Sequence, residues 1–108
     1  MHNNLKIAVA IPCYKVEQHL QQVVAGLPAF IDSILLVDDC SPDGTALLVD
    51  QLATADARIT ALHHQSNQGV GGAMKTAFRK AMESGMDVVV KLDGDGQMNA
   101  AFIQPLVE

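Results

Sequence analysis

The 108-residue sequence has few of the residues that stabilise disulfide-rich or aromatic-rich proteins. It contains no Trp, one Tyr and two Cys, and the spacing of Cys13 and Cys40 matches no common metal-binding motif. We therefore expect two reduced thiols in a cytoplasmic chain. No apolar run approaches the roughly 20 residues of a membrane-spanning helix, and the N-terminal residues lack the pattern of a signal peptide.

Positive charge is also scarce. Seven Lys and Arg residues stand against twelve Asp and Glu residues, which gives a net charge of −5. This balance argues against a nucleic-acid-binding role, because a phosphate backbone attracts a basic surface. The same balance makes a phosphorylated ligand hard to bind unless a metal ion accompanies it. Apolar residues make up 49% of the chain, enough for the core of one α/β domain.

Apolar runs alternate with segments of helical periodicity along the whole chain. Because strands that alternate with helices form parallel sheets, we predict a four-stranded, mostly parallel α/β sheet with strand order 3-2-1-4 and helices on both faces. We expect Pro12 to end the first strand. The predicted strands are Leu5–Ile11, Ile34–Val37, Arg58–His63 and Asp87–Leu92, and the predicted helices are Val16–Leu27, Ala46–Ala53, Ala73–Ser84 and Asn99–Val107.

Each predicted strand is followed by polar residues. In open α/β sheets the ligand site lies outside the carboxyl ends of the strands, where the strand order reverses. The predicted order therefore brings Tyr14, Asp39 and Asp93 together at one edge of the sheet.

The segment Asp93-Gly-Asp95-Gly-Gln97 follows the fourth predicted strand. Two carboxylates at positions i and i+2 of an extended backbone point to the same side, and they repel each other unless a cation lies between them. Mg²⁺ and Mn²⁺ prefer such oxygen ligands. A metal–phosphate site and a solvated acidic turn both remain open for Asp93 and Asp95. An EF-hand is excluded, because Met98 stands where that loop requires Gly.

Two adjacent carboxylates, Asp38 and Asp39, close the second predicted strand. Neighbouring strand residues point in opposite directions, so we expect Asp39 to contact a ligand and Asp38 to have a structural role. In the following turn, Asp43 or Ser41 is predicted to satisfy the first free N–H groups of a helix. His63 and His64 are interpreted as polar residues at a strand end.

The segment Asn67–Gly72 is rich in glycine and precedes the third predicted helix. Glycines let the backbone approach a ligand, and a helix N-terminus favours anions, which makes Gly69 a candidate for nucleotide binding. Lys75 could reach a phosphate from the first turn. Met74 and Lys75 fall outside the dinucleotide-binding and P-loop patterns. A tight loop that packs the helix against the sheet remains the alternative.

Four segments, Ile11–Tyr14, Leu36–Thr45, Asn67–Gly71 and Leu92–Gln97, resemble successive motifs of the family 2 glycosyltransferases. The resemblance is closest to the dolichyl- or polyprenyl-phosphate mannose or glucose synthase type, and it covers almost the whole chain. It implies a Rossmann-like GT-A fold and a UDP- or GDP-linked sugar donor. It also implies an Mg²⁺ or Mn²⁺ ion and inverting transfer to a polyprenyl phosphate or a glycan.

The resemblance also assigns roles to residues. It places Asp39 against the nucleobase, and it assigns Asp93 and Asp95 to the metal and to catalysis, with Gln97 near the metal. The candidates for nucleotide binding are Pro12, Tyr14, Glu17, Asp39, Gly69, Lys75 and Asp93.

Members of that family extend well beyond the segment that holds Asp93 and Asp95. We therefore expect residues 1–108 to be a single nucleotide-sugar-binding domain truncated at its C-terminus, without the acceptor site and the catalytic base. A non-catalytic nucleotide-binding or assembly module is the alternative. A sugar nucleotidyltransferase is disfavoured, because no phosphate-binding loop follows the first strand. We expect self-association through an exposed sheet edge, and a longer form could lie peripherally at the cytoplasmic membrane face.

Overall fold

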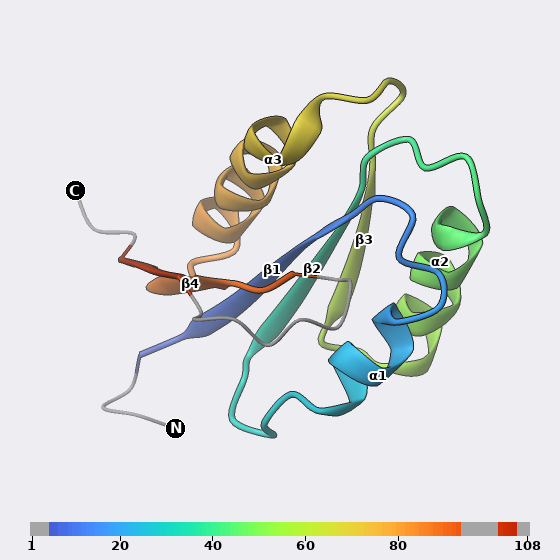
Figure 1. Ribbon diagram of the computed structural model, residues 1–108. Coiled ribbons are helices and arrows are strands. Elements are labelled where there is room, and N and C mark those ends of the chain that lie inside the picture. The colour runs from blue at the N-terminus through green and yellow to red at the C-terminus, as the bar shows by residue number, and fades with distance from the viewer. Residues whose placement is uncertain (1–4, 94–101, 106–108) are drawn as a thin grey trace.

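The computed structural model of the chain describes residues 5–93 and the backbone of residues 102–105. A five-stranded sheet in the order β3-β2-β1-β4-β5 forms the centre of the molecule (Figure 1). Over the described residues, no helix is long and apolar enough to cross a membrane. The elements along the chain are β1 (Ile7–Cys13), α1 (Leu20–Ala25), β2 (Ser33–Asp38), α2 (Thr45–Ala55), β3 (Ile59–His63), α3 (Gly69–Glu83), β4 (Val88–Lys91) and β5 (Phe102–Pro105).

The first strand, β1, lies in the middle of the sheet and pairs in parallel with both β2 and β4. β3 pairs in parallel with the other edge of β2. The predicted order 3-2-1-4 is therefore confirmed. Cys13 pairs with Asp38, and Asp38 pairs with His63. This register brings the carboxyl ends of three strands to the same edge of the sheet.

The two faces of the sheet are covered by different helices. α1 and α2 lie on one face and α3 lies on the other (Figure 1). Branched side chains such as Ile11, Leu36 and Val49 fill the core under α1 and α2. Small side chains dominate the core under α3, which includes Ala8, Ala10, Ala73, Ala77 and Ala81. Small side chains let a helix backbone approach the sheet closely, so the position of α3 depends on these alanines.

The predicted helix Asn99–Val107 is wrong over the residues that the structure describes. Phe102–Pro105 forms β5, which pairs antiparallel with β4. Phe and Ile favour strands over helices, and Pro105 cannot continue a helix interior. The edge of β4 also offers unpaired backbone groups that a fifth strand satisfies. The sheet is therefore mixed at this edge.

Pro12 does not end the first strand as predicted, because it lies inside β1 opposite Val37. The backbone of Ala10 faces β4, since its carbonyl accepts a hydrogen bond from the N–H of Leu92. Pro12 lies two residues later and faces the same side. The pairing with β4 ends at Ala10 and Lys91. The missing N–H of proline therefore removes no ladder hydrogen bond.

Two predicted helix starts are also wrong. α1 begins at Leu20 rather than Val16, because the N–H of Val16 is bound by a threonine hydroxyl and the chain turns there before the helix. α3 begins at Gly69, four residues before the predicted Ala73. The glycines that predicted a loop therefore form the first turn of α3.

Candidate functional site

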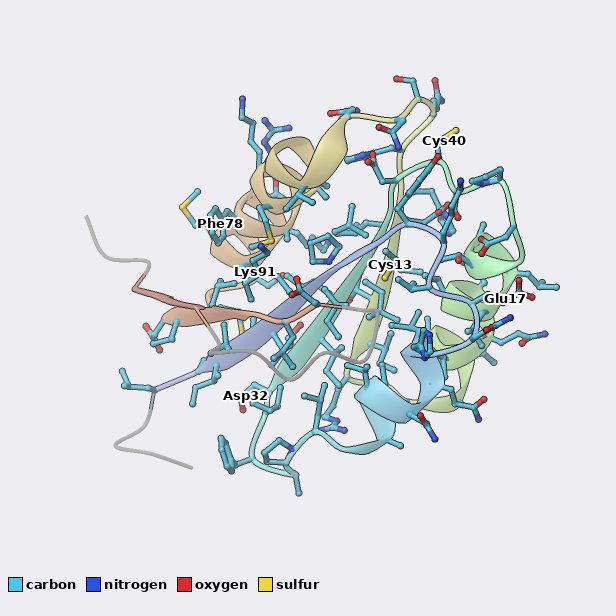
Figure 2. The ribbon with its side chains drawn as sticks, in the orientation of Figure 1. Cys13, Glu17, Asp32, Cys40, Phe78 and Lys91 are labelled. Atoms are coloured by element: carbon cyan, nitrogen blue, oxygen red, sulfur yellow. The ribbon has the colours of Figure 1, made fainter. Side chains whose placement is uncertain are left out.

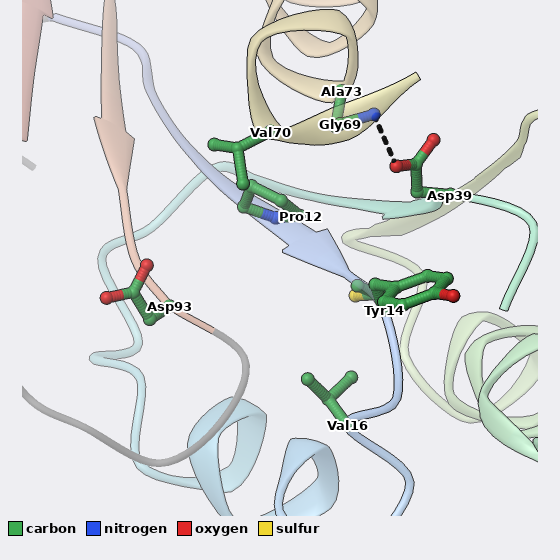
Figure 3. Close-up of a pocket in the computed structure, with 9 residues that line it drawn as sticks. Pro12, Tyr14, Val16, Asp39, Gly69, Val70, Ala73 and Asp93 are labelled. Carbon is green, nitrogen blue, oxygen red and sulfur yellow. Dashed lines mark hydrogen bonds between the residues drawn. The ribbon is translucent and has the colours of Figure 1, made fainter. Parts of the chain in front are cut away.

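A cavity of about 280 Å³ opens at the carboxyl edge of the sheet (Figure 3). It lies next to β1, where the strand order reverses: β2 and β3 follow on one side of β1, and β4 follows on the other. This is the usual ligand position in an open α/β sheet. As the strand order predicts, Tyr14, Asp39 and Asp93 share this one cavity. Its lining residues are Pro12, Cys13, Tyr14, Val16, Asp39, Gly69, Val70, Ala73 and Asp93.

Asp39 is the buried charged group of this cavity, with a relative exposure of 3%. Its Oδ1 accepts hydrogen bonds from the N–H of Gln68 and from Nδ1 of His64, both at 2.8 Å. Its Oδ2 accepts a hydrogen bond from the N–H of Gly69 at 2.8 Å (Figure 3). Burial alone raises the pKa of Asp39, but these hydrogen bonds outweigh it and lower the pKa below the ordinary 3.8. The carboxylate is therefore ionised at neutral pH.

The N-terminus of α3 is the source of two of these donors. The N–H groups of Gln68 and Gly69 are directed at Asp39, so the positive end of the helix stabilises this carboxylate. Gly69 has a positive φ of 79°, a conformation that favours glycine. The role of Gly69 in nucleotide binding stays a prediction, but the residue does line the cavity.

Asp38 points away from Asp39, as predicted for adjacent strand residues, and has a structural role. Its Oδ1 accepts a hydrogen bond from the N–H of Ser41, and its Oδ2 lies 2.9 Å from Nδ1 of His63. Nε2 of His63 lies 2.8 Å from Oδ1 of Asp50 on α2. These two carboxylates raise the pKa of His63 above its ordinary 6.5.

Two histidine–aspartate pairs were not predicted from the sequence. Asp38-Asp39 and His63-His64 end neighbouring strands, and their register places each Asp beside one His. The side chain of His64 is buried against Asp39, with an exposure of 6%. The sequence does contain a signal for these pairs, because two adjacent Asp residues and two adjacent His residues at neighbouring strand ends can pair one to one.

The loop between β1 and α1 carries Tyr14 and Val16 into the cavity wall. Lys15 lies between them with a positive φ of 56°, and its N–H donates to the hydroxyl of Ser41. The N–H of Val16 donates to the hydroxyl of Thr45. These two bonds fix the loop to the start of α2. Tyr14 remains 43% exposed, so its ring is accessible to a ligand.

Two candidates for nucleotide binding lie outside the cavity lining. Glu17 accepts a hydrogen bond from the N–H of Gly44 at 3.1 Å and so faces the start of α2 (Figure 2). Lys75 is exposed on α3. Their roles stay predictions. The N-cap residue of α2 is Gly44, and Asp43 satisfies a free N–H at the start of the helix as predicted, because its Oδ1 accepts a hydrogen bond from the N–H of Thr45 at 3.0 Å.

Asp93 lies at the end of β4 and lines the cavity opposite the Asp39 side (Figure 3). Asp95 and Gln97 lie outside the described residues. Within residues 5–93, no group of three potential metal-ligating side chains comes together. Asp93 alone supplies one carboxylate, which suits a hard cation. Its predicted partners belong to the segment beyond it, so their metal-binding role stays a prediction.

The model of the family described as "Glycosyl transferase family 2" matches residues 8–108. An undecaprenyl-phosphate mannosyltransferase from Micrococcus luteus is 33% identical over 96% of this chain and 44% of its own length. A UDP-N-acetylglucosamine–dolichyl-phosphate N-acetylglucosaminyltransferase from Methanococcus voltae is 34% identical over 94% of this chain and 47% of its own length. The chain thus spans less than half the length of these relatives.

A similar solved structure is that of the mannosyltransferase PcManGT from Pyrobaculum calidifontis in complex with GDP-Man and Mn²⁺. It is 26% identical, with a TM-score of 0.66 over 83% of this chain and 27% of that protein.

Proposed function

Because the chain belongs to glycosyl transferase family 2 and has the GT-A fold, we propose that it binds the sugar-nucleotide donor of a glycosyltransferase. One observation carries this proposal: a buried, ionised carboxylate and a strand-end carboxylate line the same cavity. The first, Asp39, suits a neutral hydrogen-bond donor of the ligand. The second, Asp93, suits a metal ion beside a diphosphate.

The nucleoside would occupy the part of the cavity between β1 and the start of α3. Tyr14 offers an accessible ring and Pro12 an apolar surface for a flat base. A carboxylate has about four acceptor positions, and three on Asp39 are occupied. One position remains for an N–H of the base. A volume of about 280 Å³ lies near the lower end of ligand pockets, about 300–1,000 Å³, so it suits a nucleoside better than a whole sugar nucleotide.

Asp93, with Asp95 and Gln97, would hold Mg²⁺ or Mn²⁺. The ion would stabilise the charge that develops on the diphosphate as it leaves the anomeric carbon. The presence of Mn²⁺ and GDP-Man in the similar mannosyltransferase structure supports this assignment. Glu17 and Lys75 remain second candidates near the nucleotide.

The acceptor attacks the anomeric carbon from the face opposite the diphosphate, with inversion. The names of the relatives support a polyprenyl phosphate as the acceptor. The UDP-linked sugar in one relative's name and the GDP-Man in the similar structure leave both kinds of donor as candidates. A peripheral position at the cytoplasmic membrane face would bring the site to such a lipid.

Isothermal titration calorimetry tests this function with UDP and GDP, each with and without Mn²⁺. We expect metal-dependent binding of at least one of the two. We also expect the double variant Asp93→Asn and Asp95→Asn to lose this dependence. Asp43→Asn is the matched control, because Asp43 lies at the start of α2 and outside the cavity. Equal binding by the double variant and the wild type would contradict the proposal.

A non-catalytic nucleotide-binding or assembly module remains the second candidate, since the chain spans less than half of its relatives. A turnover assay separates the two, with GDP-mannose or a UDP-linked sugar and a polyprenyl phosphate. Transfer by this chain would exclude the module, whereas nucleotide binding without transfer would favour it.

A further inference from the structure

His64 connects three elements directly behind the cavity. It follows β3, its Nδ1 lies 2.8 Å from Oδ1 of Asp39 after β2, and its Nε2 lies 2.7 Å from the hydroxyl of Thr76 on α3. The side chain is buried, and His64 does not line the cavity. Any influence of His64 on a ligand must therefore pass through Asp39.

The hydrogen bonds determine which ring nitrogen of His64 carries the proton. An ionised carboxylate only accepts hydrogen bonds, so Nδ1 of His64 must carry the proton that binds Asp39. Nε2 can then accept a hydrogen bond from the hydroxyl group of Thr76. Both ring nitrogens are satisfied, and the ring is held in one orientation between β2 and α3.

We propose that His64 is a positioning residue for nucleobase recognition, because it completes the donor set that holds the Asp39 carboxylate in place. His64 and the N–H of Gln68 together occupy both acceptor positions of Oδ1. The N–H of Gly69 occupies one position of Oδ2. The remaining position of Oδ2 is thus the one left for a base N–H.

The two backbone donors alone do not define this arrangement. Both come from the start of α3, so they fix the carboxylate relative to that helix only. His64 ties the same oxygen to the end of β3. Without it, one acceptor position of a buried carboxylate is unpaired, and the group gains from turning toward water. Such a turn would take Oδ2 out of line with the base.

This inference rests on the proposed function, and substitutions at His64 test it separately. Asn places its amide nitrogen three bonds from Cα, as Nδ1 of His does, so His64→Asn keeps a donor for Asp39. Gln places its amide nitrogen four bonds from Cα, as Nε2 does, so His64→Gln keeps a group near Thr76 but not the donor. The two variants are matched in polarity and differ by one methylene.

The measurement is the Kd of UDP and GDP, and separately of pyrophosphate, all with Mn²⁺. We expect His64→Gln to bind the nucleoside diphosphate about tenfold more weakly and His64→Asn to stay within about threefold of the wild type. Pyrophosphate has no base, so its affinity should be the same in all proteins. His63→Gln is the control at the neighbouring position, which faces Asp38 instead, and it should bind both ligands like the wild type.

Equal affinities of the Asn and Gln variants for the nucleoside diphosphate would overturn the inference. So would a parallel loss of pyrophosphate binding in His64→Gln, because that loss would indicate a general structural defect. If the wild type binds pyrophosphate with Mn²⁺ but neither nucleotide, the proposed function fails instead.

Discussion

Replacing Asp39 with Asn should destabilise the fold, and the structure sets the size of the effect. The carboxylate accepts three hydrogen bonds at 2.8 Å, two on Oδ1 and one on Oδ2. An amide has one oxygen and one NH₂ group. If its oxygen replaces Oδ1, the NH₂ group faces the N–H of Gly69, donor against donor. One bond is therefore lost and two become neutral.

The loss of stability can be worked out from these bonds. A hydrogen bond to a charged group contributes about 1.5–3 kcal/mol, and a neutral one about 0.5–1.5 kcal/mol. One lost bond (about 1.5–3 kcal/mol) and two weakened ones (about 1–1.5 kcal/mol each) sum to about 3.5–6 kcal/mol. The neutral amide costs less to bury than a charge, so we expect a net loss of about 2–4 kcal/mol.

Urea unfolding measures this loss. With a slope near 1.5 kcal/mol per molar urea, the midpoint of Asp39→Asn should fall by about 1.3–2.7 M, with no change in slope. Asp43→Asn is the control, because Asp43 also accepts a backbone N–H but is exposed. A midpoint for Asp39→Asn no lower than that for Asp43→Asn would refute the reasoning.

The pH dependence of the same difference gives a second check. The pKa of Asp39 is lower in the folded chain than its ordinary 3.8, because the hydrogen bonds outweigh burial. The stabilisation of the fold by the ionised Asp39 carboxylate is therefore complete above pH 3.8 and is lost as the pH falls through the pKa of Asp39 in the folded chain. The stability difference between wild type and Asp39→Asn should shrink on acidification below pH 3.8.

Three further predictions concern other parts of the molecule. Cys40 is exposed, whereas burial, and then the charge of Asp38, raise the pKa of the Cys13 thiol to about 12. A thiol-reactive dye should thus label one cysteine per folded chain, and labelling of Cys13 at a similar rate would contradict the burial. The carboxylates of Asp38 and Asp50 raise the pKa of His63 above 6.5. The stabilisation of the fold by protonated His63 is therefore complete below pH 6.5 and is lost as the pH rises through the pKa of His63 in the folded chain. The melting temperature of His63→Gln should approach that of the wild type between pH 6 and pH 9, and a constant gap would count against the pair. Among the described strands, β3 pairs with β2 alone, so we expect concentration-dependent self-association in light scattering, and a clean monomer at high concentration would exclude it.

The sequence was sufficient to predict four strands, because buried parallel strands read as short apolar runs between amphipathic helices. Their order followed from the polar residues at the strand ends, since the ligand site of an open α/β sheet lies where the strand order reverses. The prediction failed at Pro12, where the outcome depends on which neighbour the residue faces. β4 pairs only as far as Ala10, so proline is tolerated two residues later. That information lies in the register, which no local pattern contains.

The candidate site, too, could be predicted only in part. The strand order alone predicted that Tyr14, Asp39 and Asp93 come together. The two backbone donors to Asp39 could not be predicted, because the N–H groups of Gln68 and Gly69 reach it from a segment more than 20 residues away. Glycine near residue 69 indicated a loop, whereas the structure uses those residues as the first helical turn, with the helix N-terminus directed at a carboxylate.

The central position of β1 also sets the order in which the chain can assemble during synthesis. β1 can pair with β2 soon after both are synthesised. Its other neighbour, β4, comes much later, since Val88 of β4 follows its partner Ile7 of β1 by 81 positions. At about 5–20 residues per second, the ribosome leaves that side of β1 open for roughly 4–16 s. The nascent chain must keep the vacant side of β1 from pairing with a neighbouring nascent chain until β4 arrives.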